Sequence, residues 1–223
     1  MYPILAFSDL HFPWHSKIAM GGVLHGIRKY RPKTVVCLGD LYDQFSFSRF
    51  MHTQSLYTPK DEIVTARKYA EKLWFQIGRA VPKAKLFQLR GNHDERVVAR
   101  LLGRAPELEY FADFDSIYTF DGVETLASER DELILRGIVF QHGFKTKLGD
   151  HCRQNLMRTV VGHSHRPGIY YLPLKGEVVW ELNVGHCADR HAQPMSYTKQ
   201  RQLSTWTKGF GVIDKYGPRF ITL

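Results

Sequence analysis

The chain has 223 residues, 43% of them hydrophobic and 24% charged, which is ordinary for a globular protein. No stretch is long and apolar enough to cross a membrane, and the opening residues lack the basic leader and apolar core of a signal peptide. The formal net charge of +9 favours polyanionic ligands, of which nucleic acid is the commonest, although solubility alone is the alternative explanation.

We expect one domain over residues 1–223, because no Ser/Gly/Pro-rich linker, low-complexity segment or internal repeat divides the chain. The three cysteines, Cys37, Cys152 and Cys187, form no Cys-x-x-Cys pair. This spacing is typical of reduced thiols and argues against a disulfide framework or a thiolate zinc site. We therefore expect a cytoplasmic protein, and the sequence indicates no particular protein partner.

The first predicted strand, Ile4–Phe7, runs into the polar segment Ser8-Asp9-Leu10-His11. Side chains two residues apart in an extended segment point to the same side, so Asp9 and His11 could hold one cation together. The spacing of apolar residues over 15–30 then predicts a helix.

The second predicted strand is the continuous apolar run Thr34–Leu38, which is typical of a buried parallel strand. It ends at Gly39-Asp40, where the glycine permits a close backbone approach. Asp43, three residues further on, is interpreted as orienting the loop rather than binding a metal.

Residues 44–58 form a loop rich in aromatic residues, for which two interpretations stay open. The preferred interpretation is a loop that packs its own rings. The other is a wall of the substrate cleft that stacks on a base. Residues 59–80 predict the clearest helix, and its apolar stripe at helical spacing indicates core packing.

The apolar run Leu86–Leu89 predicts a third strand, and it leads into Gly91-Asn92-His93-Asp94. Ligands and reacting groups in α/β sheets commonly lie where strands end. This motif supplies a metal or phosphate ligand, a titratable imidazole and a carboxylate to orient that imidazole. By itself the motif could equally cap a helix.

A helix is predicted directly after this motif, over residues 95–102, with arginines four residues apart on one face. Arg96 lies next to the reactive loop and is the candidate phosphate contact. Arg100 and Arg104 are interpreted as a solvated helix face.

The second half of the chain repeats the pattern of a strand followed by ligands and glycine. Ile138–Gln141 is followed by His142-Gly143, and Thr159–Val161 is followed by Gly162-His163-Ser164-His165. A short helix is expected over 148–157, whereas residues 105–132 show no clear pattern. Further strands are expected over 169–172, 178–182, 209–213 and 220–223, with a long polar loop over 186–205.

Five strand ends thus present seven oxygen or imidazole donors, namely Asp9, His11, Asp40, Asn92, His142, His163 and His165. The set suits divalent manganese, iron, zinc, nickel or cobalt, and it contains too many imidazoles for calcium or magnesium. It is large enough for two ions on the order of 3.5–4 Å apart, which form a clamp for in-line displacement at phosphorus. The histidines without a strand-end setting are left out: His25, His52, His151, His191 and, as the closest exception after Gly185, His186.

The motifs stand in an order that resembles the calcineurin-like metallophosphoesterase superfamily. They are Asp9-Leu10-His11, Gly39-Asp40-Leu41-Tyr42-Asp43, Gly91-Asn92-His93-Asp94, His142-Gly143 and Gly162-His163-Ser164-His165. The resemblance implies an α/β (α+β) fold, a four-layer β-sandwich of two mixed sheets flanked by helices. It also implies an enzyme, a metal-dependent phosphoesterase that acts as a hydrolase on ester bonds.

The resemblance assigns Asp9, His11, Asp40 and His165 to a first metal, and Asp40, Asn92, His142 and His163 to a second. Asp40 would bridge the two divalent ions, for which manganese is expected first and iron, zinc, nickel or cobalt are alternatives. His93 would contact the phosphate or protonate the leaving oxygen, and Asp94 would orient its imidazole. Asn92 and Arg96 are the expected substrate contacts.

Two departures separate the chain from the protein Ser/Thr phosphatase branch. That branch has Asp-Arg-Gly where this chain has Asp43-Gln44-Phe45, and it has Glu in place of Asp94. The Asn-His-Asp and Gly-His-Ser-His forms are more similar to the nuclease and phosphodiesterase branches. Residues 91–96 and 206–214 also resemble, more loosely, small phosphoesterases encoded by bacteriophages.

The expected reaction is hydrolysis of a nucleic-acid or nucleotide phosphoester by metal-activated hydroxide, with His93 as the general acid. A small-molecule phosphatase, such as a nucleoside monophosphate phosphatase, or a cyclic-nucleotide phosphodiesterase is the alternative within the enzymes. A metal-stabilised binding module on an inactive scaffold is the alternative outside them. The presence of every expected ligand and of His93 argues against that module.

Overall fold

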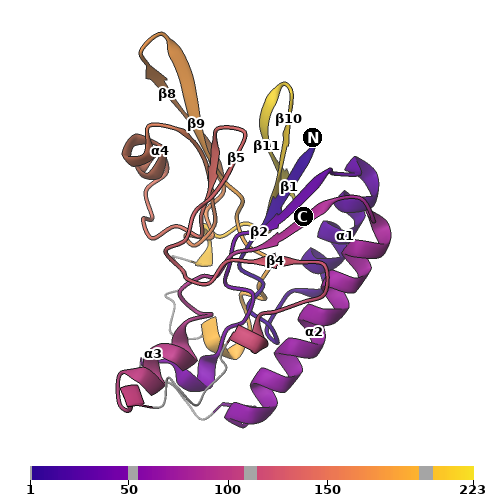
Figure 1. Ribbon diagram of the computed structural model, residues 1–223, viewed down its shortest axis with the longest axis vertical. Helices are drawn as coiled ribbons and strands as arrows, with labels where there is room; N and C mark the ends of the chain where they lie inside the picture. The colour runs from indigo at the N-terminus through magenta and orange to yellow at the C-terminus, as the bar shows by residue number, and fades with distance from the viewer. Residues whose placement is uncertain (1, 50–54, 108–114, 196–202) are drawn as a thin grey trace.

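The computed structural model describes residues 2–49, 55–107, 115–195 and 203–223, and in these ranges the strands form two mixed sheets (Figure 1). The first sheet has the order β11-β10-β1-β2-β3-β4. Its strands β1 to β4 run parallel, whereas β10 pairs antiparallel with both β1 and β11. The bounds are β1 Ile4–Phe7, β2 Thr34–Cys37, β3 Lys85–Gln88, β4 Glu124–Thr125, β10 Gly209–Asp214 and β11 Gly217–Thr222.

The second sheet has the order β5-β6-β7-β9-β8. Strands β6, β7 and β9 are parallel neighbours, and β5 and β8 lie antiparallel at the two edges. The bounds are β5 Leu133–Leu135, β6 Ile138–Phe140, β7 Arg158–Val161, β8 Gly168–Leu174 and β9 Glu177–Asn183.

Three of the helices lie on the outer faces of the two sheets. Figure 1 shows α1 and α2 side by side against the first sheet, and α4 packs against β7 and β9 of the second. A further helix, α3, follows the loop after β3. The bounds are α1 Lys17–Tyr30, α2 Pro59–Ala80, α3 Arg96–Leu102 and α4 Asp150–Asn155, with 3-10 turns at Phe45–Phe47, Asp115–Ile117 and Gln193–Met195.

Alternation along the strands divides the core into two parts. In β1, Leu5 and Phe7 belong to the cluster that α1 and α2 cover, and Ile4 and Ala6 belong to the cluster between the sheets. Successive side chains in a strand point to opposite faces. Because both faces of β1 are covered, its four residues are all buried, which explains the continuous apolar run in the sequence. The predicted fold class, two mixed sheets flanked by helices, is confirmed.

The predicted elements lie close to their observed bounds. The helix expected over 15–30 begins at Lys17, because the Ser16 side chain accepts a hydrogen bond from the Ala19 N–H and caps it. The helix expected over 148–157 is shorter and spans α4. The uncertain stretch 105–132 contains β4 and the 3-10 turn Asp115–Ile117, with 108–114 outside the described residues. Among the described residues, no helix is long and apolar enough to span a membrane.

Candidate metal centre

The carboxyl ends of five parallel strands deliver the predicted ligands. Strands β1, β2 and β3 of the first sheet lead into Asp9 and His11, Asp40, and Asn92, while β6 and β7 of the second lead into His142, His163 and His165. Backbone hydrogen bonds join the loops, with the Asp9 N–H donating to Gly39 O at 3.1 Å and the His11 N–H to Asp40 O at 3.0 Å. The edge of the sandwich where both sheets end therefore collects all seven side chains.

Five of the seven residues have a backbone in the left-handed region, with φ between 48° and 64°. Non-glycine residues rarely adopt this conformation, and it costs on the order of 1–3 kcal/mol at each position. Such strain persists only where the surrounding structure holds it, and it gathers at functional sites. The five are Asp9, His11, Asp40, His163 and His165.

Two motif glycines make room for the carboxylates. A Cβ atom at Gly91 would lie 2.2 Å from Asp40 Oδ1, and one at Gly162 would lie 2.7 Å from Asp9 Oδ2. Any side chain at either position would therefore displace a predicted ligand. This explains why glycine directly precedes Asn92 in the loop after β3 and His163 in the loop after β7.

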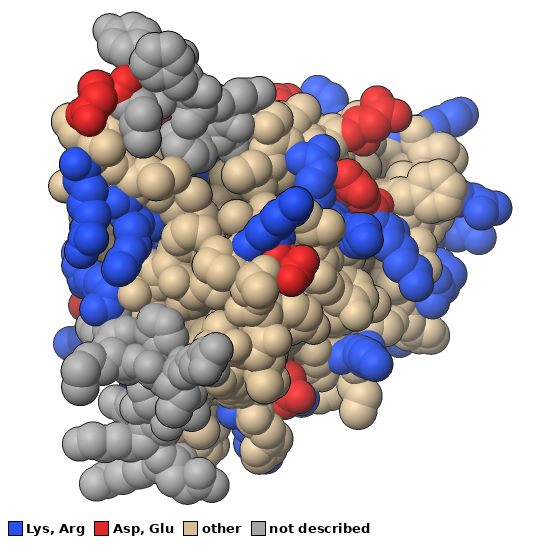
Figure 2. Space-filling view, turned by 90° about the horizontal axis from the view of Figure 1, so that it is seen from below, with Lys and Arg blue, Asp and Glu red and all other residues tan. Residues whose placement is uncertain are grey.

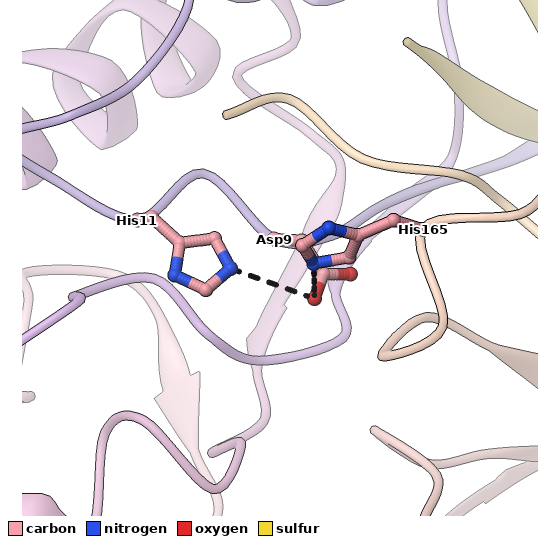
Figure 3. A group of neighbouring side chains, drawn as sticks. All are labelled: Asp9, His11 and His165. Atoms are coloured by element: carbon pink, nitrogen blue, oxygen red, sulfur yellow. Dashed lines mark hydrogen bonds and ion pairs between the residues drawn. The ribbon is translucent and has the colours of Figure 1, made fainter. Parts of the chain in front are cut away.

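The first group consists of Asp9, His11 and His165, whose ligand atoms lie within 4.8 Å of one another (Figure 3). His165 Nε2 is 3.0 Å from Asp9 Oδ1, and His11 Nε2 is 3.8 Å from the same oxygen. Figure 3 shows both imidazoles directed at this carboxylate. All three side chains are buried, and His11 Nε2 has no hydrogen-bond partner among the described residues.

The second group consists of Asp40, Asn92, His142 and His163. His142 Nε2 lies 3.3 Å from Asp40 Oδ2 and 3.2 Å from Asn92 Oδ1. His163 Nδ1 lies 3.0 Å from the same amide oxygen and 3.3 Å from His142 Nε2. Four donor atoms from four loops thus lie next to one another, each 3.0–3.3 Å from at least one other.

Asp40 joins the two groups. Its Oδ2 atom is 3.8 Å from His11 Nε2 in the first group and 3.3 Å from His142 Nε2 in the second. Its Oδ1 atom accepts a hydrogen bond from the His93 N–H at 2.8 Å. This carboxylate therefore lies between the two groups and contacts both.

The close contacts between the aspartates and histidines of the cluster shift their pKa values in opposite directions. Burial raises the pKa of Asp40, but the nearby His142 and His93 outweigh it and hold the pKa below the ordinary value of 3.8. Burial opposes the protonation of His11, yet hydrogen bonds to Asp43 and Asp9 raise its pKa to about 10. His142 likewise reaches a pKa of about 9, through Asp40. The buried carboxylates thus favour positive charge within the cluster, which a divalent cation would also supply.

The donor set fits divalent metal ions. Carboxylate, amide and imidazole donors without thiolate are the ligands of manganese, iron, zinc, nickel and cobalt. The pKa of His163 falls to about 4, because burial and the neighbouring His142 disfavour its charged form, so its ring is neutral at neutral pH and could act as a ligand. The partnerless nitrogen of His11 is buried between the carboxylates of Asp9 and Asp40, a setting that a bound cation would satisfy.

His93 stands beside the two groups, between a carboxylate and a guanidinium. Its Nδ1 atom is 3.4 Å from Asp43 Oδ2, and its Nε2 atom is 3.0 Å from Arg96 Nη2 and 3.9 Å from Asp40 Oδ2. Arg96 also donates to both the backbone oxygen and Oδ1 of Asp43, each at 3.0 Å. Burial lowers the pKa of the His93 ring. Arg96 thus lies beside the two groups and contacts the imidazole itself.

The structure corrects the role expected for Asp94. Its carboxylate accepts hydrogen bonds from the backbone N–H groups of Gly91 at 2.8 Å, Tyr42 at 2.9 Å and Leu41 at 3.3 Å. It therefore joins the loops after β2 and β3 and does not orient the His93 ring. Asp43 takes that position, because its Oδ2 atom lies next to both His93 Nδ1 and His11 Nδ1, the latter at 2.8 Å.

Sequence reasoning left out one histidine that lies next to the cluster. The His186 ring stacks on His165, with centroids 5.0 Å apart and planes inclined by 20°. It is buried, and neither ring nitrogen has a hydrogen-bond partner among the described residues. Burial lowers its pKa to about 2. The signal that could have placed it here is Gly185-His186 directly after β9, the same strand-end pattern as the predicted ligands.

The other excluded histidines have settings away from the cluster. His151 is buried beneath the loop after β6, where Nε2 accepts hydrogen bonds from the N–H groups of Phe144 at 3.1 Å and Lys145 at 3.2 Å. His25 and His191 are exposed. His52 lies outside the described residues.

A family model for calcineurin-like phosphoesterases matches residues 2–190. The chain belongs to this family. It is therefore a metal-dependent phosphoesterase, a hydrolase, and its buried aspartate and histidine groups could hold the metal.

Two bacteriophage proteins are similar along almost the whole chain. The Gene 54 protein of Mycobacterium phage D29 is 25% identical over 231 residues, which cover 96% of this chain and 89% of the relative. The Gene 54 protein of Mycobacterium phage L5 is 27% identical over 235 residues, with the same coverage. Both agree with the loose resemblance to phage proteins. Among solved structures, Yfce, a phosphoesterase from E. coli, is 17% identical and covers 96% of this chain and 89% of its own, with a TM-score of 0.47.

Proposed function

We propose that this phosphoesterase uses two divalent metal ions, manganese first among them, to hydrolyse phosphodiester bonds of nucleic acid or nucleotides. The observation that carries the proposal is the convergence of seven donors in two groups around Asp40, with His93 at their side. The formal net charge of +9 supports a polyanionic substrate.

The residues divide the work as follows. Asp9, His11 and His165 hold one ion, Asn92, His142 and His163 hold the other, and Asp40 contacts both. Bound there, the ions supply an acidified water as the nucleophile and positive charge for the phosphate oxygens. The Asn92 side chain lies next to the place that the phosphate would occupy and helps to position it.

His93 serves as the general acid in this proposal. Its Nε2 atom lies 3.9 Å from Asp40 Oδ2, so a leaving oxygen at the cluster comes within its reach, and it donates a proton there once Arg96 Nη2, now 3.0 Å away, has turned to the phosphate. Asp43, at 3.4 Å from Nδ1, stabilises the imidazolium and fixes the ring. Arg96 contacts both side chains and adds positive charge next to the phosphate.

The test is a panel of substrates assayed with Mn²⁺: bis-nitrophenyl phosphate, nitrophenyl phosphate, mononucleotides, and single- and double-stranded DNA. We expect cleavage of the diester and of DNA by the wild type and its loss in Asp40→Ala. His93→Ala should lose its activity on DNA, by about 10²–10⁴-fold, far more than on bis-nitrophenyl phosphate, whose leaving group hardly needs a proton. Release of phosphate from mononucleotides with DNA left intact would instead identify a nucleotide phosphatase.

A further inference from the structure

A groove of about 550 Å³ opens beside the second metal group. Asn92, a predicted ligand, lines its inner end, and Phe47, Arg49, Arg96, Arg100 and Arg104 line its walls. The groove thus begins at the reacting centre and continues along α3. Figure 2 views the molecule from below, and it shows Lys and Arg side chains gathered at the left edge, on the side where Figure 1 places α3.

Three arginines form a ladder along the groove, two of them on α3 and one in the turn that follows it. Arg96 and Arg100 are four residues apart on α3, which on a helix is about 6 Å along the same face, and Arg104 lies in the turn that follows Leu102. Arg96 is held at the inner end by Asp43 and His93. Arg100 and Arg104 are exposed, and neither forms an ion pair with another described residue.

The aromatic loop after β2 supplies another part of the lining. Phe47 is half-buried and lines the groove together with Arg49, whereas Phe45 is buried against Trp14, with ring centroids 6.4 Å apart. The two interpretations of this loop therefore apply to different residues: Phe45 packs inward, and Phe47 forms part of a wall. Positive charge combined with an aromatic face is the usual composition of a groove that follows a single strand of nucleic acid.

We propose that this groove binds the sugar-phosphate backbone of single-stranded nucleic acid next to the bond that is cleaved, with Arg100 and Arg104 contacting successive phosphates. The inference rests on the proposed function, and it names the substrate class of the same site. A single strand is favoured because the groove is of small-molecule size and joins arginines to an aromatic ring, whereas a duplex presents two charged backbones and keeps its bases stacked inside.

The groove carries more arginines than acidic residues, so its net charge is positive. Glu95 and Glu129 also line it, but Glu95 Oε1 lies 3.7 Å from Arg90 Nη1, which offsets its charge. Against these two carboxylates stand four arginines. The two exposed arginines of the ladder are the groups that a polymer can reach and a small diester at the metals cannot.

The experiment compares wild type with the double variant Arg100→Gln/Arg104→Gln. A matched control, Arg28→Gln/Arg79→Gln, removes the same charge from exposed positions on α1 and α2. Each protein, loaded with Mn²⁺, is assayed for cleavage of a single-stranded oligonucleotide of about 12 nucleotides and of bis-nitrophenyl phosphate. Binding is measured separately by fluorescence anisotropy with a phosphorothioate oligonucleotide that resists hydrolysis.

We expect the groove variant to bind the oligonucleotide about tenfold more weakly or worse, and to lose kcat/KM on it to the same extent. The salt dependence of its binding should flatten by about 1.4 in log–log slope, because each phosphate contact contributes about 0.7 on single strands. Hydrolysis of bis-nitrophenyl phosphate should not change in either variant, and the control should bind the oligonucleotide like wild type.

Equal oligonucleotide binding and an equal salt slope in wild type and groove variant would overturn the inference, whatever the enzyme cleaves. A groove variant that loses binding although wild type binds DNA without cutting it would uphold the groove and contradict the proposed nuclease activity. The two claims therefore fail separately.

Discussion

At the scale of single residues, Asp43 contacts three side chains of the site at once. Its Oδ2 atom lies 2.8 Å from His11 Nδ1 and 3.4 Å from His93 Nδ1, and its Oδ1 atom accepts from Arg96 at 3.0 Å. One buried carboxylate thus fixes a predicted metal ligand, the predicted acid and the arginine at the head of the groove. Hydrogen bonds of this kind keep a ligand imidazole in the required tautomer and orientation.

Asp43→Asn should therefore weaken metal binding and catalysis together. We expect the Kd for Mn²⁺ to rise about 10–100-fold, because the His11 ring loses its charged partner. Isothermal titration calorimetry with Mn²⁺ measures this directly. Asp121→Asn, at an exposed turn, is the matched control and should bind like wild type. Unchanged Mn²⁺ affinity in Asp43→Asn would remove Asp43 from the site.

Asp94→Ala should act on stability instead. Its carboxylate satisfies three buried backbone N–H groups, and each one left without a partner costs about 1–3 kcal/mol. We expect the free energy of unfolding, measured in urea, to fall by about 3 kcal/mol or more. A variant as stable as wild type would show that these hydrogen bonds matter little.

At the scale of elements, Glu181 of β9 determines where α4 begins. Its carboxylate accepts hydrogen bonds from the N–H groups of Gly149, His151 and Cys152, at 2.9, 2.9 and 3.0 Å. Anionic side chains are favourable at a helix N-terminus because the first N–H groups are otherwise unpaired. Through α4, Glu181 also positions His151, which in turn holds the loop after His142.

Glu181→Gln should reduce stability in a pH-dependent way. Burial raises the pKa of Glu181, but contacts with His151 and the backbone N–H groups outweigh it and leave the pKa below its ordinary value of 4.5. A lowered folded-state pKa stabilises the fold above the unfolded-state pKa, and this stabilisation disappears as the pH falls. We expect a loss of about 1–3 kcal/mol at neutral pH in urea unfolding, and a smaller loss below the ordinary pKa. A pH-independent loss would contradict the electrostatic explanation.

At the scale of the whole molecule, the cluster joins the two sheets. Asp9, His11 and Asp40 come from the first sheet, and His142, His163 and His165 come from the second. A metal ion bound by both groups therefore stabilises the complete fold. At a metal concentration of 100 Kd, one site adds about 2.7 kcal/mol.

We accordingly expect Mn²⁺ to raise the Tm of wild type by several degrees in a thermal unfolding scan, since about 1 kcal/mol shifts the Tm of a protein of this size by 2–4 °C. Asp40→Ala should lose most of the shift, because both groups depend on this carboxylate. His25→Ala, at an exposed position of α1, should keep it. An equal shift in all three proteins would point to metal binding elsewhere.

The strand-end ligands could be predicted because each is encoded locally, by an apolar run and a glycine within a few residues of the donor. The antiparallel pairing of β1 with β10 could not be predicted, because β10 lies about 200 residues away in the sequence and no spacing of residues signals the pairing. The same limit explains Asp94 and Asp43. Adjacency in sequence suggested Asp94 beside His93, whereas the contact depends on how the loops after β2 and β3 lie together.

The most direct test of the central claim is anomalous diffraction at the manganese edge from crystals of the protein soaked in Mn²⁺. The account predicts two peaks, one among Asp9, His11 and His165 and one among Asn92, His142 and His163, with the Asp40 carboxylate between them. A single peak, or peaks away from Asp40, would contradict a two-metal centre at this edge of the sandwich.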